Sequence, residues 1–88
     1  MRLDKFLKTS RLMKRRTLAK QLADQGRVQI NGQVAKAGTN VAVNDEITIQ
    51  FGQTKVTVIV QSIRDVVRKD EAETLYRIVS EERINSDS

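Results

Sequence analysis

The stretch MKRRTLAKQLADQGRVQINGQ, residues 13–33, decides the fold because it changes from a helical pattern to a strand pattern at Gly26. Its first half carries an apolar stripe at helical spacing, formed by Leu18, Ala19, Leu22 and Ala23. This spacing predicts a helix over about residues 16–25. Gly26 suits the left-handed residue that commonly follows a helix end.

After Gly26 the hydrophobic period is two. Val28 and Ile30 alternate with polar residues, and Asn31-Gly32 follows, the strongest short-range hairpin signal because both turn positions favour positive φ. Three further runs with the same period predict strands, containing Val41 and Val43; Ile47, Ile49 and Phe51; and Val56, Val58 and Val60. The sequence therefore predicts helices followed by a small sheet.

The two ends of the chain complete the expected α+β fold, in which two short amino-terminal helices pack on a small, mostly antiparallel sheet. A first helix is predicted from the apolar spacing of Leu3, Phe6, Leu7 and Ser10. Residues 65–83 form a carboxy-terminal extension, predicted to be helical from about residue 70, with a strand through 75–79 as the alternative. We expect residues 1–64 to be one domain and residues 84–88 a disordered tail.

Composition argues against an enzyme. The 88 residues include no Cys and no His, which removes thiolate chemistry, the usual acid-base group and the commonest metal ligands. We therefore expect no catalytic residue, no metal and no cofactor. The sequence has no apolar run of membrane-spanning length and no signal-peptide pattern at its amino terminus, so we expect a cytoplasmic protein with no membrane partner.

Positive charge is concentrated in the first third of the chain. Residues 1–27 contain nine basic and two acidic residues, a net charge of +7, whereas the remainder carries −2. A field of one sign is typical of proteins that bind polyanions and release their counterions. The alternative is a basic face kept for solubility alone.

Basic residues are the candidate site. Because aromatic residues are few, stacking on unpaired bases is not expected to dominate, and an array of charges suits the phosphates of folded RNA. The predicted RNA-binding residues are Arg2, Arg11, Lys14, Arg15, Arg16, Lys20 and Arg27. Arg2, Arg15 and Arg16 rank first because Arg holds phosphate bidentately, and Lys5 and Lys8 rank as solvated charges. An ion pair with Asp4 is the alternative role for Arg2.

Three segments, MRLDKFL, KRRTLAKQLADQGRVQINGQ and KAGTNVAVNDEI, resemble the domain named after the fourth small-subunit ribosomal protein, also called the alpha-L RNA-binding motif. The resemblance covers residues 1 to about 51. Two positions depart from the family pattern. Arg15 stands where many relatives have a capping Ser, so the second helix lacks a hydroxyl cap or begins elsewhere, and Asn44 replaces a Gly, which Asn tolerates at positive φ.

The length and the extension resemble the small heat-shock-type ribosome-binding proteins of this family, and most of all its short ribosome-associated quality-control P factors. The resemblance implies a free-standing binder of large-subunit rRNA and tRNA on stalled subunits that carry peptidyl-tRNA. It also implies a partner, the NEMF-like tailing factor RqcH, which adds alanines to the stalled peptide. We expect a monomer.

Other functions stay open at this point. One is a general ribosome-assembly or heat-shock factor that binds rRNA. A helix-turn-helix DNA regulator is less favoured, because a hairpin directly follows the second helix. A third is an interaction module that uses the carboxy-terminal extension.

Overall fold

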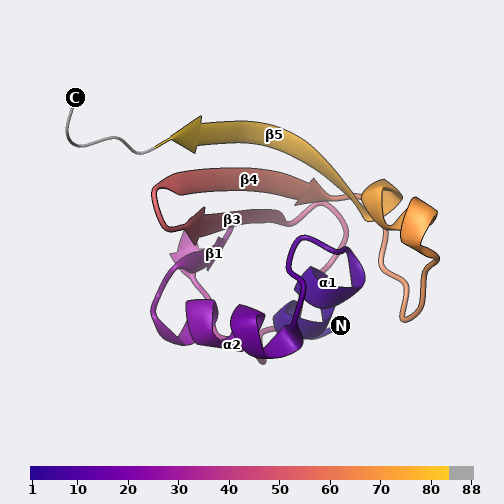
Figure 1. Cartoon of the computed structure of the whole chain (residues 1–88), viewed down its shortest axis with the longest axis horizontal. Coiled ribbons are helices and arrows are strands. Elements are labelled where there is room, and N and C mark those ends of the chain that lie inside the picture. The colour runs from indigo at the N-terminus through magenta and orange to yellow at the C-terminus, as the bar shows by residue number, and fades with distance from the viewer. Residues whose placement is uncertain (84–88) are drawn as a thin grey trace.

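A computed structural model describes residues 1–83 and shows two helices packed on one antiparallel sheet (Figure 1). The elements follow in the order α1 (Leu3–Thr9), α2 (Arg16–Asp24), β1 (Val28–Ile30), β2 (Gln33–Val34), β3 (Glu46–Phe51), β4 (Thr54–Val60), the 3-10 helix η1 (Lys69–Leu75) and β5 (Tyr76–Arg83). The sheet has the strand order β2-β1-β3-β4-β5. The predicted α+β fold is confirmed.

Local signals in the sequence account for the helix ends. Arg15 is the N-cap of α2 and makes no side-chain capping bond, as expected where a capping Ser is absent. Gly26 follows the end of α2 with φ +75, a left-handed value that costs glycine little. α2 therefore stops at a defined point, and the chain turns into β1.

Two tight turns set the register of the sheet. Asn31 and Gly32 have φ values of 54 and 84, and they join β1 to β2 with Ile30 opposite Gln33. A second turn at Gly52 joins β3 to β4 with Phe51 opposite Thr54. The predicted turn at Asn31-Gly32 is confirmed, and so is the positive φ of Asn44, at 77.

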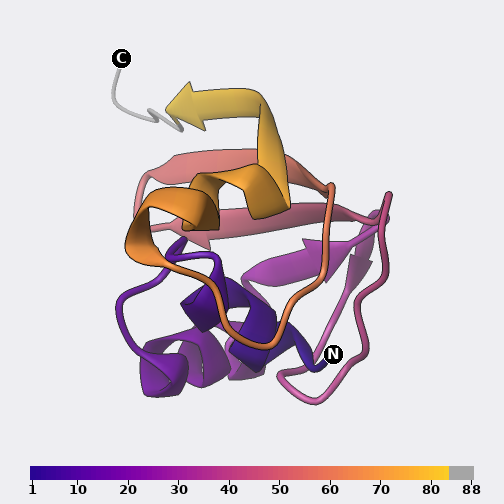
Figure 2. The same ribbon diagram turned by 90° about the vertical axis from the view of Figure 1, so that its right-hand side faces the viewer.

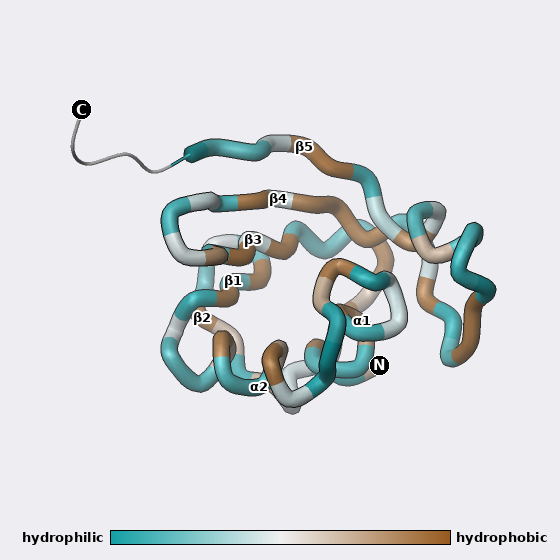
Figure 3. The backbone as a smooth tube through the Cα atoms, viewed as in Figure 1, coloured by the Kyte–Doolittle hydropathy of each residue, from teal (hydrophilic) through white to brown (hydrophobic). Residues whose placement is uncertain are grey.

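The core lies between the helices and one face of the sheet. Leu3, Phe6 and Leu7 of α1 are fully buried, and they share one hydrophobic cluster with residues of β1, β3 and β4. Both helices lie on the same side of the sheet (Figure 1), and hydrophobic stretches run along β3 and β4 (Figure 3). The outward sides of the helices remain exposed.

Two sequence expectations are wrong in detail. Leu18 was expected in the buried stripe of α2 but is 39% exposed, because the inward face of α2 is the narrower row of Ala19, Leu22 and Ala23. The run with Val41 and Val43 is not a strand. Val41 is buried, but its backbone N–H donates to the carbonyl of Met1 at 2.9 Å, so the amino terminus holds this segment in place of a strand.

The helix predicted from about residue 70 to 83 is also wrong. Only Lys69–Leu75 is helical, as a 3-10 helix, and Tyr76–Arg83 forms β5, the alternative that the sequence had left open. β5 pairs with β4 because that strand has a free edge, and a bulge interrupts the register near Thr57. Figure 2 shows the chain passing from β4 through a long loop to η1 and back to β5.

The division of the chain into residues 1–64 and 65–83 stays a prediction, although both parts share this sheet. The expected disordered tail, residues 84–88, lies outside the described residues.

Candidate nucleic-acid interface

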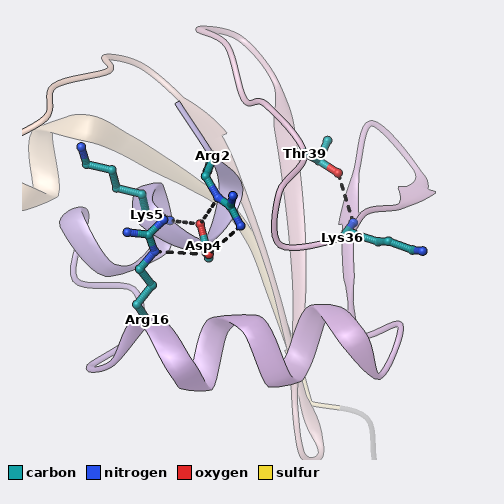
Figure 4. A network of polar contacts seen from close by, with 6 residues as sticks. All are labelled: Arg2, Asp4, Lys5, Arg16, Lys36 and Thr39. Carbon is teal, nitrogen blue, oxygen red and sulfur yellow. Dashed lines mark hydrogen bonds and ion pairs between the residues drawn. The ribbon is translucent and has the colours of Figure 1, made fainter.

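A buried carboxylate joins the amino-terminal ends of the two helices (Figure 4). Asp4 lies in the first turn of α1, with its side chain only 5% exposed. Its Oδ1 is 3.3 Å from Nε of Arg2, and its Oδ2 is 3.2 Å from Nε of Arg16. The backbone N–H of Lys5 donates to Oδ1 at 2.7 Å. We call these three side chains, Arg2, Asp4 and Arg16, the arginine clamp.

The fold places each arginine of the clamp. Arg16 begins α2 and lies three residues before buried Ala19, so it is on the face of α2 that turns towards α1. Arg2 precedes α1 and forms an isolated β-bridge with Asn40. The guanidinium of Arg2 packs beside Gly38, with Nη2 3.6 Å from the position that a Cβ would take there. Arg2 is thus held both by Asp4 of α1 and by the distant segment of residues 38–40.

The clamp keeps positive charge on the surface. Burial acts to raise the pKa of Asp4, but the hydrogen bonds from Arg16 and Arg2 outweigh it and lower the pKa below its ordinary value. The carboxyl is therefore ionised, and one charge of the two arginines is left over. Both arginines remain about half exposed, at 55% and 49%. Since a guanidinium has five N–H donors and Asp4 engages few of them, donors remain for a phosphate.

The structure brings the other predicted residues together only in part. Arg11 and Lys14 lie on the turn between α1 and α2 and line one hollow. Arg15, Lys20 and Arg27 are exposed, and none of them pairs with a carboxylate of residues 1–83. Arg27 comes after α2, beyond the end opposite to Arg16, and a helix of nine residues is about 13.5 Å long. The cations therefore follow α2 and its preceding turn.

Aromatic stacking is not available on this face. Phe6 is fully buried, and Phe51 and Tyr76 are partly buried against the core. Charge and shape are thus the means of recognition that the face offers. Within residues 1–83, no group of three or more Asp or Glu residues could hold a metal ion. No helix of that same range has the length and apolarity to cross a membrane.

Sequence reasoning missed three features of the interface. The joint use of Asp4 by both arginines was not foreseen, although the pairing of Arg2 with Asp4 had been an alternative and is present. Lys8 was ranked as a solvated charge but lines the same hollow as Arg11 and Lys14. No pattern in the sequence indicates that Lys8 lies opposite residues 65–67. Lys5, also ranked as solvated, pairs with Asp65 at 3.1 Å.

Comparison with known proteins agrees with this geometry. Residues 1–47 match the model of the S4 domain. The two basic helices and the hairpin that follows them therefore belong to an S4 domain. The RQC P-site tRNA stabilizing factor of Halalkalibacterium halodurans is 59% identical over 85 residues, covering 97% of this chain and 97% of that protein. The factor of the same name from Bacillus subtilis is 57% identical, covering 96% and 98%. The chain belongs to the family of these RQC P-site tRNA stabilizing factors.

A solved structure shares most of this architecture. The trimeric structure of heat shock protein 15 from Vibrio cholerae matches with a TM-score of 0.84 and 38% identity, covering 91% of this chain and 82% of that one. The likeness therefore extends past the S4 domain into the carboxy-terminal part of the sheet.

Proposed function

We propose that this protein binds P-site tRNA and neighbouring rRNA on large ribosomal subunits that still carry peptidyl-tRNA after stalled translation. In doing so it supports alanine tailing by the NEMF-like factor RqcH. The names of its relatives support tRNA as the ligand. The arginine clamp is the structural observation on which the proposal of RNA binding by this chain rests. The protein acts as a binding factor and performs no reaction.

The clamp suits folded RNA for a physical reason. Arg2 and Arg16 are held by a common carboxylate, so less side-chain entropy is lost when a phosphate binds. Fixed cations match phosphates that a folded RNA also holds at fixed separations, whereas a flexible single strand has no such spacing. The clamp therefore favours tRNA and rRNA by shape, and it reads no base directly.

A small rigid domain gains selectivity when it touches two RNAs at once. Contact with rRNA raises the effective concentration of the domain at the tRNA, so the two contacts together bind more tightly than either alone. The extended row of cations along α2, from Arg16 through Lys20 to Arg27, offers the area for a second contact. The factor then lengthens the residence of the tRNA, because the tRNA leaves only after its contact with the domain, or the contact of the domain with rRNA, has also broken.

A binding experiment tests the proposal. Large subunits with and without peptidyl-tRNA are titrated with the full chain and with Arg16→Ala, with Lys69→Ala as a control at an exposed cation outside the predicted set. We expect tighter binding when peptidyl-tRNA is present. Arg16→Ala should weaken binding about tenfold, equivalent to about 1.4 kcal/mol, and reduce alanine tailing, while Lys69→Ala should change neither. Equal affinity for both kinds of subunit would contradict the proposal.

A second candidate is a general rRNA-binding factor for ribosome assembly or heat shock. Heat shock protein 15 of Escherichia coli is 38% identical and covers 91% of this chain, although the chain spans only 61% of that relative. Capture of the tagged protein from cells separates the candidates. Large-subunit rRNA with tRNA and the tailing factor supports the first, and assembly precursors without tRNA support the second. A DNA locus would contradict both.

A further inference from the structure

A hollow of about 430 Å³ lies beside the turn that joins α1 to α2. One wall comes from this turn, and the other comes from residues 65–67 of the loop between β4 and η1. Figure 2 shows this loop running in front of α1, and the ion pair between Lys5 and Asp65 ties the two segments together. The second wall lies outside the S4 domain match, which covers residues 1–47. We call the hollow the turn pocket.

The turn pocket has an apolar side. Met13 is nearly buried in its lining, and Val67 packs partly buried against the core. Val66 also lines it and is 86% exposed, although a single exposed valine alone would need no explanation. Val66 lines the same hollow as Met13 and Val67, so a flat apolar group in the hollow could pack against it.

The rim of the turn pocket is cationic. Lys8, Arg11 and Lys14 line it, and no carboxylate of residues 1–83 lies within 4.0 Å of their charged nitrogens. The one acidic residue of the lining, Asp65, is already paired with Lys5. This differs from the arginine clamp, whose charges share a buried carboxylate. Three charges around one hollow repel one another unless an anion lies between them.

Arg11 occupies a strained position in this turn. Its φ is 62, in the left-handed region that glycine adopts easily and a long side chain does not. The backbone N–H groups of Arg11 and Met13 donate to the carbonyls of Lys8 and Leu7, both at 3.0 Å, and so hold the turn in this shape. Glycine would fit the backbone better, so an arginine here indicates that the guanidinium has a use.

These features together specify a ligand. Cations around the rim suit phosphates, an apolar wall suits the face of a base, and a guanidinium can stack on the same base. The volume falls within the range of about 300–1,000 Å³ that is usual for small-ligand pockets, and so suits a single nucleotide. A paired base in a duplex cannot enter such a hollow, whereas a base in a loop or bulge can leave its stack.

We propose that the turn pocket receives one unstacked nucleotide of the bound RNA, with its base against Val66 and Val67 and its phosphates on Lys8, Arg11 and Lys14. The pocket thereby adds a readout of local RNA structure to the shape recognition by the arginine clamp. This inference rests on the proposed function in one respect, namely that the partner is a folded RNA.

Three variants of the full chain test the pocket. Val66→Glu places a negative charge beside the expected base and phosphates, and Val66 is so exposed that the fold should not change. Arg11→Gly removes the guanidinium while relieving the left-handed backbone, so it should melt no lower than the wild type. Val79→Glu is the matched control, since Val79 is an exposed valine of β5 that does not line the pocket.

The measurements are affinity for large subunits carrying peptidyl-tRNA and chemical probing of base accessibility in the bound RNA. We expect Val66→Glu and Arg11→Gly each to weaken binding about fivefold or more, and Val79→Glu to bind like the wild type. The wild type should protect one unpaired nucleotide that both pocket variants leave reactive, with other protections kept.

Other results would overturn the inference. If both pocket variants bind with wild-type affinity while Arg16→Ala loses binding, the pocket has no role in RNA binding, and the proposed function still holds. Uniform loss of all protections in the pocket variants would also count against it, as would crosslinking of residue 66 to a protein instead of RNA. If the chain prefers another RNA, the same variants are tested on that RNA, so failure of the proposed function is seen separately.

Discussion

Replacement of Asp4 by Asn tests the arginine clamp directly. Asn keeps the shape of the side chain and one oxygen that can accept the hydrogen bond from the N–H of Lys5. It removes the negative charge that holds Arg2 and Arg16, at 3.3 and 3.2 Å. The variant therefore separates the two ion pairs from the local hydrogen bond.

The expected loss of stability follows from the exposure of the partners. A hydrogen bond to a buried charge contributes about 1.5–3 kcal/mol, but both guanidinium groups are half exposed and are screened by solvent. We therefore assign about 1 kcal/mol to each pair, or about 2 kcal/mol in total. For a domain of this size, each kcal/mol lowers the Tm by about 4–8 °C. Asp4→Asn should then melt about 8–16 °C lower at pH 7.

The loss should depend on pH in a defined direction. Because the pKa of Asp4 is lowered in the folded protein, its contribution is complete above the ordinary value of about 3.9 for an unfolded chain. It disappears as the pH falls below that value and through the lowered pKa. The difference in Tm between wild type and Asp4→Asn should therefore narrow steadily below about pH 4.

Thermal unfolding followed by circular dichroism at several pH values measures both effects. Asp24→Asn is a matched control, since Asp24 is exposed at the end of α2, and it should shift the Tm by no more than about 4 °C. A Tm of Asp4→Asn equal to that of the control at pH 7 would refute the clamp as a stabilising network. A difference that does not narrow in acid would refute the assigned charge.

Three more outcomes are expected. Leu22→Ala, which opens the core under α2, should lower the free energy of unfolding by about 2–5 kcal/mol, measured by urea denaturation; a loss below 1 kcal/mol would contradict the packing. Arg15→Ala should leave the Tm almost unchanged, because Arg15 is exposed and caps nothing, whereas Arg16→Ala should cost about 1 kcal/mol; equal melting curves would show that Arg16 does not need Asp4. The slope of log affinity for structured RNA against log salt should flatten by slightly less than one unit in Arg16→Ala but not in Lys69→Ala, and equal slopes would refute the assigned face.

Local chemistry decided the first half of the fold, and it can be read from the sequence. The end of α2 needs only one residue that accepts a positive φ, and Gly26 is that residue. The hairpin turn needs two such residues, Asn31 and Gly32. The helices show their period because each buries one side against the same core. The basic face follows from the helix period as well, since the charges fill the sides left over.

The carboxy-terminal part depended on tertiary structure. The segment at residues 70–83 suits a helix by its spacing and a strand by its Tyr-Arg-Ile-Val composition, so local preferences conflict. The free edge of β4 resolves the conflict by offering backbone partners from Thr54 to Val60. The run with Val41 and Val43 has the strand period but forms no strand, because the backbone N–H of Val41 donates its hydrogen bond to the amino-terminal segment.

Sequence alone identified the charged residues, and only the tertiary structure divided them into groups. Arg15 and Arg16 are neighbours of the same type, yet only Arg16 reaches Asp4, because Arg15 is the N-cap with an extended backbone whereas Arg16 is the first residue of α2. The turn pocket depends on a still longer range, since residues 8–14 meet residues 65–67 only after the chain has completed most of the sheet. Charge and local period are properties of the sequence, whereas partners distant in sequence are chosen by packing of the whole chain.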